Sequence, residues 1–477
     1  MFRFNLIKYQ IRYLSSEARL LKGTLTLRFH DYLTNNHGQE EQQKSKIIED
    51  IEKISDRGRG KTEKIKIMDR SYMKSLRNQL RHEDMIECLE YLVKIYPNQI
   101  LNLRFFDEAL KILLENDKIC RNEFVKLCYF IGFLKKFQPG PKYLEYLIDK
   151  YLDDKLGSNE LNRMDFAIFC ISTYKSSVRI SNKKFHDRLI AEVLATDDND
   201  TYLLVAFVKS LKQNEIVSSQ VIYKLRELIE AFEFDYASLV HILPYIADNS
   251  IKDDSLIQLI CTKCINTFDD NVRAKDVQKF LHSCAMLNLK MNKADLEKLE
   301  NVIISRTSSD EYKTHFDHFV NAALSLWMLN HQSNKLIKIL FEDSRFYKTG
   351  LENRLKLDSR KLLLQTCVEI EKPKWINQSN SSSFLETRTS PGYLIKSSLE
   401  RAMNTVLADK NGIFVQQIKN LNLAGILVTE NDEKIHYEIL DRNTCLSDRK
   451  TPNGIFQLKL RLLRKKKCNV KVISIFK

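Results

Sequence analysis

The chain has 477 residues, of which 43% are hydrophobic, and its formal net charge is +14. At about 150 residues per domain, this length predicts roughly three units, or one extended solenoid with an appendage. No stretch approaches the ~20 consecutive apolar residues that a membrane-spanning helix needs, which argues against an integral membrane protein. The positive charge favours polyanionic partners, nucleic acid above all.

Glycine and proline are scarce, with 12 and 7 residues respectively. Because these residues punctuate β-rich folds, their scarcity predicts long helices joined by short polar turns. The 10 cysteines are scattered, and most of them lie within apolar helical patterns. We therefore expect reduced, buried thiols, as in a cell interior or a mitochondrial matrix, and no disulfide framework.

The first 75 residues fall into two parts. Residues 1–16, MFRFNLIKYQIRYLSS, hold basic residues separated by apolar ones and contain no acidic residue. Such an amphipathic, arginine-bearing segment predicts a mitochondrial targeting peptide and a location in the matrix; the alternative is a first helix of the folded domain. Residues 17–75 are polar and mixed in charge, so we expect a flexible linker with one transient helix at most.

Residues 76–371 consist of one helical pattern after another. Residues 83–96, for example, place apolar side chains on one face at helical spacing. The segments form recurring pairs, whose starts lie near Met164, Thr201, Asp235, Lys275 and Thr314. A helix pair cannot bury its apolar face alone, so the recurrence predicts an α-solenoid with a long groove.

Two groups of side chains within these helices suggest metal ligands. Cys261 and Cys264 form a CxxC pair, and Cys284 follows, but apolar helical patterns surround all three, so we expect core packing. His315 and His318 lie three residues apart on a predicted helix, although the sequence shows no evident acidic or cysteine partner for them. We therefore predict no metal site in the helices.

The pattern changes after residue 371. Residues 372–411 begin with a Ser/Asn-rich stretch, which predicts a linker, and end with a connecting helix. Residues 412–477 contain strand-like stretches at 412–430, 434–440 and 469–476 and a helix at 456–466. The chain is therefore expected to be mostly α, with an α-solenoid of helix pairs followed by a small α/β domain.

This C-terminal order resembles the RAP domain. The resemblance rests on an apolar strand that ends in Glu430, a strand that carries His436, a basic helix, and a closing strand at 470–475. The stretches 322–329 and 361–375 resemble the helical region of the FAST kinase-like proteins. Members of that family act in mitochondrial RNA processing, stability and translation, mostly as RNA-binding factors. The resemblance implies mitochondrial mRNA or rRNA precursors as partners, together with other RNA-granule proteins, and no cofactor.

The RAP module is similar to a nuclease-like fold, so metal-dependent RNA cleavage is an alternative function. Nucleases of that type need an acid on one strand and a Glu-x-Lys pair on the next. Glu430 supplies the first acid and is a weak metal candidate, but Glu438 is followed two residues later by Leu440 in place of lysine. A kinase would need a glycine-rich phosphate loop and HRD and DFG motifs, which the sequence lacks. We predict no catalytic residue.

Basic side chains accumulate at the C-terminus, where 10 of them and no acid follow Asp448. Such a cluster releases counterions from a nucleic-acid backbone, whereas a solvated helix end is the alternative reading. The expected RNA contacts are Lys459, Arg461, Arg464, Lys465, Lys466 and Lys467, with His436 as a structural or RNA-facing polar residue. RNA binding without chemistry is thus the predicted function; a nuclease and a protein-interaction scaffold are the alternatives.

Overall fold

The computed structural model describes most of the chain beyond residue 45. The described residues are 29, 32–33, 46–55, 61–77, 80–95, 100, 103–116, 119–134, 139–157, 160–196, 201–269, 272–347, 355–374 and 397–476. The expected targeting peptide at 1–16 and most of the expected linker after residue 371 lie outside them. The described part contains no helix that is both long and apolar enough to cross a membrane.

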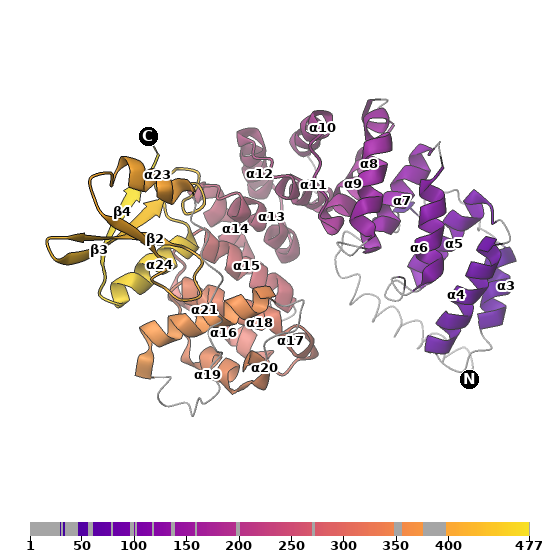
Figure 1. Cartoon of the computed structure of the whole chain (residues 1–477). Coiled ribbons are helices and arrows are strands. Elements are labelled where there is room, and N and C mark those ends of the chain that lie inside the picture. Colours follow the sequence, from indigo (N-terminus) through magenta and orange to yellow (C-terminus); the bar gives the residue numbers. More distant parts are fainter. Residues whose placement is uncertain are drawn as a thin grey trace. The chain divides into compact units, whose positions relative to one another are not determined.

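The architecture is mostly helical and ends in one four-stranded sheet, which confirms the predicted fold class (Figure 1). The chain divides into two compact units, Met1–Leu228 and Ile229–Lys477. The pairs predicted at five starts are present, as α9 with α10, α11 with α12, α13 with α14, α15 with α16, and α18 with α19.

The first unit is built from helices alone in its described part. Its helices are α3 (Lys46–Ser55), α4 (Lys61–Arg77), α5 (His82–Ile95), α6 (Arg104–Leu114), α7 (Arg121–Leu134), α8 (Gly140–Gly157), α9 (Arg163–Ser176), α10 (Lys183–Leu194), α11 (Thr201–Gln213) and α12 (Ser219–Ala231), the last of which reaches into the second unit. Helices α7, α9 and α11 pack side by side in one row. The row is the inner layer that stacked helix pairs require.

The expected flexible linker at 17–75 is wrong for residues 46–55 and 61–77, which form α3 and α4. These helices pack against each other, and α4 also packs against α6. Ile48 and Ile51 are buried on α3, and Met68 and Tyr72 are buried on α4. Charged residues fill the other faces, so the apolar stripe is narrow and the composition resembles that of a linker.

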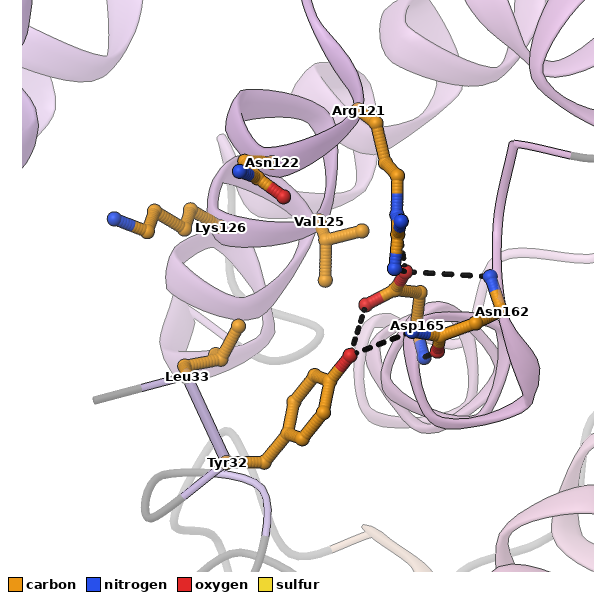
Figure 2. A pocket seen from close by; sticks show the side chains of 8 residues that line it. All are labelled: Tyr32, Leu33, Arg121, Asn122, Val125, Lys126, Asn162 and Asp165. Atoms are coloured by element: carbon orange, nitrogen blue, oxygen red, sulfur yellow. Dashed lines mark hydrogen bonds and ion pairs between the residues drawn. The ribbon is translucent and has the colours of Figure 1, made fainter. Parts of the chain in front are cut away.

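Part of the same expected linker is also packed in the first unit, as Figure 2 shows. The Tyr32 hydroxyl donates to Asp165 Oδ1 at 3.1 Å and accepts from Asn162 Nδ2 at 2.8 Å. Arg121 Nε donates to the second carboxylate oxygen of Asp165 at 2.6 Å. Because Asp165 is buried, this network satisfies a charge that would otherwise be costly. Tyr32 thereby ties the N-terminal region to α7 and α9.

The second unit continues the helix pairs. Its helices are α13 (Tyr236–Asp248), α14 (Asp254–Thr267), α15 (Ala274–Met286), α16 (Lys293–Ser305), α17 (Asp310–Thr314), α18 (Phe316–Met328), α19 (Asn334–Glu342), α20 (Ser344–Tyr347), α21 (Leu355–Glu371), α23 (Ser397–Thr405) and α24 (Gly454–Lys465). Asp235, Asp253 and Asn292 start three of them with side-chain caps, which satisfy free amides of the first turn. Cys261, Cys264 and Cys284 are buried between α14 and α15, so the prediction of core packing is confirmed.

The C-terminal domain is a mixed sheet between two helices. Its strands are β1 (Gly412–Val415), β2 (Gly425–Glu430), β3 (Glu433–Leu440) and β4 (Asn469–Ser474), in the order β1-β2-β3-β4. The first three are antiparallel, and α24 returns the chain so that β4 runs parallel to β3. Alternate residues of β3 face opposite sides. Ile435, Tyr437 and Ile439 pack toward α23, while Leu440 packs against Phe456 of α24.

This domain is docked closely on the helices of the same unit. At Gly454, the first residue of α24, a Cβ would lie 1.7 Å from the carbonyl oxygen of Ala285. The amide of Ser447 donates to the Ser250 carbonyl oxygen at 2.7 Å, and its hydroxyl accepts from the amide of Lys252 at 2.9 Å. Only glycine allows this approach of α24 to α15. The α/β domain is therefore held by backbone contacts on α13–α15.

Candidate nucleic-acid interface

Lys459 does not reach the surface, so the expectation that it contacts RNA is wrong in this structure. Its side chain is 0% exposed and forms an ion pair with Glu438, which is 1% exposed. Its ammonium also donates to the carbonyl oxygen of Ala424 at 3.0 Å. Burial raises the pKa of Glu438, and Lys459 opposes that rise. Lys459 is the counterion of a buried carboxylate and joins α24 to the sheet.

Arg461 is also engaged within the protein. Its Nε donates to Glu371 Oε1 at 2.8 Å, and its Nη2 donates to the carbonyl oxygen of Trp327 at 2.8 Å. Glu371 in turn accepts from the Trp327 indole at 2.5 Å. The guanidinium therefore links α24 to the ends of α18 and α21. We correct its expected role from RNA contact to domain docking.

His436 lies on β3 under α24 and is 6% exposed. Burial lowers its pKa, and the charges of Lys459 and Lys466 lower it further. Its Nδ1 has no hydrogen-bond partner among the described residues. Of the two roles predicted for His436, a neutral, enclosed imidazole fits the structural one, and it offers RNA little surface.

The run Arg464 to Lys467 is exposed, as the sequence suggested. It ends α24 and precedes β4, so it lies at the end of the sheet where β4 begins. Lys466 Nζ donates to the Gln417 carbonyl oxygen at 3.4 Å, and within the described residues the run forms no ion pair. Its charges are available to a polyanion.

The Glu430 carboxylate is paired with basic and hydroxyl groups of the protein. It pairs with Lys410, accepts from the Tyr437 hydroxyl at 2.5 Å, and lies 3.9 Å from Lys471 Nζ. The hydrogen bonds from Lys410 and Tyr437 hold the pKa of Glu430 below its usual range.

The two acids of the nuclease hypothesis are on different faces of the sheet. Glu430 lies opposite Glu433 in the sheet. The Val428–Ile435 pair lies two residues away and packs toward α23, so Glu430 is on the α23 side. Glu438 lies on the α24 side, where a Cβ on Gly425 would approach its carboxylate to 2.6 Å. A metal ion that needs carboxylates on neighbouring strands cannot use both.

A basic hollow that sequence analysis does not predict lies at the opposite end of the sheet, where β3 and β4 end. It has a volume of about 620 Å³. We call it the arginine hollow; it is lined by Ser397, Ser398, Arg401, Asp441, Arg442, Asn443, Arg449, Ile475 and Phe476. Ligands of open α/β sheets commonly bind outside the carboxyl ends of parallel strands, and β3 and β4 are such a pair.

The arginine hollow carries a net positive charge. Arg401, Arg442 and Arg449 are exposed, and within the described residues none forms an ion pair. The Arg449 guanidinium lies over the Phe476 ring, 5.5 Å from its centroid. The buried Asp441 carboxylate accepts from the Ser398 hydroxyl at 2.7 Å and from nearby loop donors, so it stabilises the wall.

These arginines escape sequence reasoning because they come from separate segments. Arg401 is on α23, whereas Arg442 and Arg449 lie in the one loop that joins β3 to α24.

No protein-family model matches the chain, and no curated protein shows a significant match to it. The resemblance to the RAP domain and to the FAST kinase-like proteins therefore stays a prediction. The functional assignment depends on the geometry and charge of the chain's own residues.

Proposed function

We propose that this protein binds single-stranded RNA through its C-terminal α/β domain and acts by binding, without chemistry of its own. The observation that carries the proposal is the arginine hollow, where three exposed guanidinium groups surround an open space beside an aromatic ring. The formal charge of +14 adds a long-range attraction for polyanions.

The side chains of the hollow suit the parts of a nucleotide. Guanidinium groups bind phosphate with paired, planar hydrogen bonds, and Arg401, Arg442 and Arg449 provide three of them. Phe476 and the Arg449 guanidinium that lies over its ring offer planar groups on which an unpaired base can stack. The space of about 620 Å³ lies within the range of small-ligand pockets. A duplex presents no free base faces, so these features favour a single strand.

The exposed run Arg464 to Lys467 supports the same function from the other end of the sheet. Its contribution is salt-sensitive attraction without sequence preference.

The proposed setting is the mitochondrial matrix, with mitochondrial transcripts as targets and RNA-granule proteins as further partners. The acid-free, arginine-bearing segment at residues 1–16 and the resemblance of the helical and C-terminal regions support it. Fusion of residues 1–30 to a fluorescent protein tests the mitochondrial targeting. The proposal requires mitochondrial fluorescence, and diffuse cytosolic fluorescence contradicts it.

RNA binding is tested with the full chain and a fluorescently labelled oligouridine by anisotropy. The variant R442A/R449A removes two hollow arginines, and the control R81A/R179A removes two exposed arginines of the first unit that pair with Asp84 and Glu215. Each phosphate contact on a single strand contributes ~0.7 to the salt slope, so the first variant should bind more weakly with a slope about 1.4 shallower. Equal affinities and slopes for the two variants would contradict the proposal.

A further inference from the structure

Three potential metal ligands meet at the corner between α17 and α18. His315 separates the two helices, and Asp317 and His318 follow in the first turn of α18. Their ligand atoms all lie within 4.8 Å of one another. In the part of the chain that the structure describes, no other group of three such side chains is this close. Asp317, which lies between the two histidines in the chain, provides an acidic partner that the spacing of the histidines alone does not indicate.

The buried nitrogen of His318 is left unsatisfied by the described residues. The side chain is 15% exposed, its Nδ1 has no hydrogen-bond partner, and the nearest oxygen of Asp317 is 3.6 Å away. A neutral imidazole with its proton on Nε2 has a free lone pair at this nitrogen, and that is the form in which histidine binds a metal.

We propose that His315, Asp317 and His318 together bind one zinc ion, or a divalent transition ion of similar chemistry, with solvent in the remaining position. Tetrahedral zinc at 2.0–2.2 Å from its ligands needs ligand atoms roughly 3.3 Å apart. The three ligand atoms lie within 4.8 Å of one another, so they have to move closer to reach this spacing. His315 is exposed and the Asp317 side chain is 47% exposed, so both can turn toward His318.

The ligand types select the ion, and charged side chains tune its affinity. Lys275 lies within electrostatic range of His318, and Arg360 lies within electrostatic range of Asp317. Glu311 is the other nearby acid, and it is engaged by Arg306 at 2.6 Å. Mg²⁺ prefers an octahedral shell of oxygen ligands, which two imidazoles and one carboxylate do not provide. Imidazole ligands favour zinc, nickel and copper.

The site is tested with the full chain after removal of metal by a chelator, by titrating Zn²⁺ in competition with a chromophoric chelator. The chain should bind one equivalent that excess Mg²⁺ does not displace. Asp317→Asn, which is nearly isosteric at a half-exposed position, should weaken this equivalent at least about tenfold. His318→Ala should abolish it, and Lys275→Ala should strengthen it because a neighbouring positive charge is removed.

The matched control is His186→Ala in the first unit, where the imidazole contacts the Ile180 carbonyl oxygen. This variant should keep the full zinc stoichiometry and affinity. Co²⁺ in place of zinc should give visible absorption bands that vanish in the His318 variant. The proposal is overturned if Asp317→Asn and His318→Ala bind zinc as the unaltered chain does, or if Mg²⁺ competes equally.

Discussion

Replacement of Lys459 by methionine tests the interior of the C-terminal domain. The ammonium is 0% exposed and its partner Glu438 is 1% exposed, so the substitution leaves a carboxylate buried without a counterion. Removing one partner of a buried ion pair typically costs about 3–5 kcal/mol. We expect the free energy of unfolding of this domain to fall by that amount, because methionine replaces the packing of the lysine stem but not its charge.

The loss should depend on pH. Burial already raises the pKa of Glu438, and without Lys459 nothing opposes the rise. An acid whose pKa is higher in the folded state than in the unfolded state destabilises the fold increasingly as pH rises above the unfolded value. Lys459→Met should therefore cost more stability at pH 8 than at pH 5, where Glu438 can take up a proton.

The assay is amide hydrogen exchange of β3 in the full chain, which reports local opening free energies, with urea unfolding followed by circular dichroism. Lys459→Met combined with Glu438→Leu should recover most of the loss, since a buried pair can be replaced by apolar residues at little cost. Unchanged exchange in the single variant, together with weakened RNA binding, would refute the reasoning and return Lys459 to an RNA-contacting role.

Three further predictions concern docking and binding. Gly454→Ala should loosen the contact of α24 with α15 and speed amide exchange in α15, because a Cβ would collide with the Ala285 carbonyl; unchanged exchange would contradict the tight docking. Arg461→Ala should shift the fluorescence of Trp327, whose indole shares Glu371 with this guanidinium; an unaltered spectrum would argue against the shared contact. Phe476→Ala should weaken oligouridine binding by about 1–3 kcal/mol and Phe476→Trp should preserve it, whereas equal affinities would exclude stacking.

The helical repeats were predictable because apolar spacing is local information. The helix pairs between α9 and α19 can be predicted from apolar side chains three or four residues apart. The same spacing predicts which of these side chains are buried. Helices α3 and α4 were missed because their narrow stripes, such as Ile48 and Ile51, are surrounded by charge. The average composition of a long segment does not reveal an apolar stripe as narrow as those of α3 and α4.

The candidate site was predictable only in part. The exposed basic run Arg464 to Lys467 could be predicted because its residues are consecutive in the sequence. Lys459 was misassigned because net charge does not show which face a residue occupies, although its spacing from Phe456 and Leu463 places it on the buried face. The arginine hollow depends on tertiary structure, since α23 and the loop between β3 and α24 bring its arginines together.

The most direct test of the central claim is photocrosslinking of the full chain to an oligouridine, with adducts located by mass spectrometry. The account predicts adducts at Phe476 and in the loop 441–453, and their loss in the R442A/R449A variant. Adducts confined to other parts of the chain, or the same adducts in that variant, would contradict RNA binding in the arginine hollow.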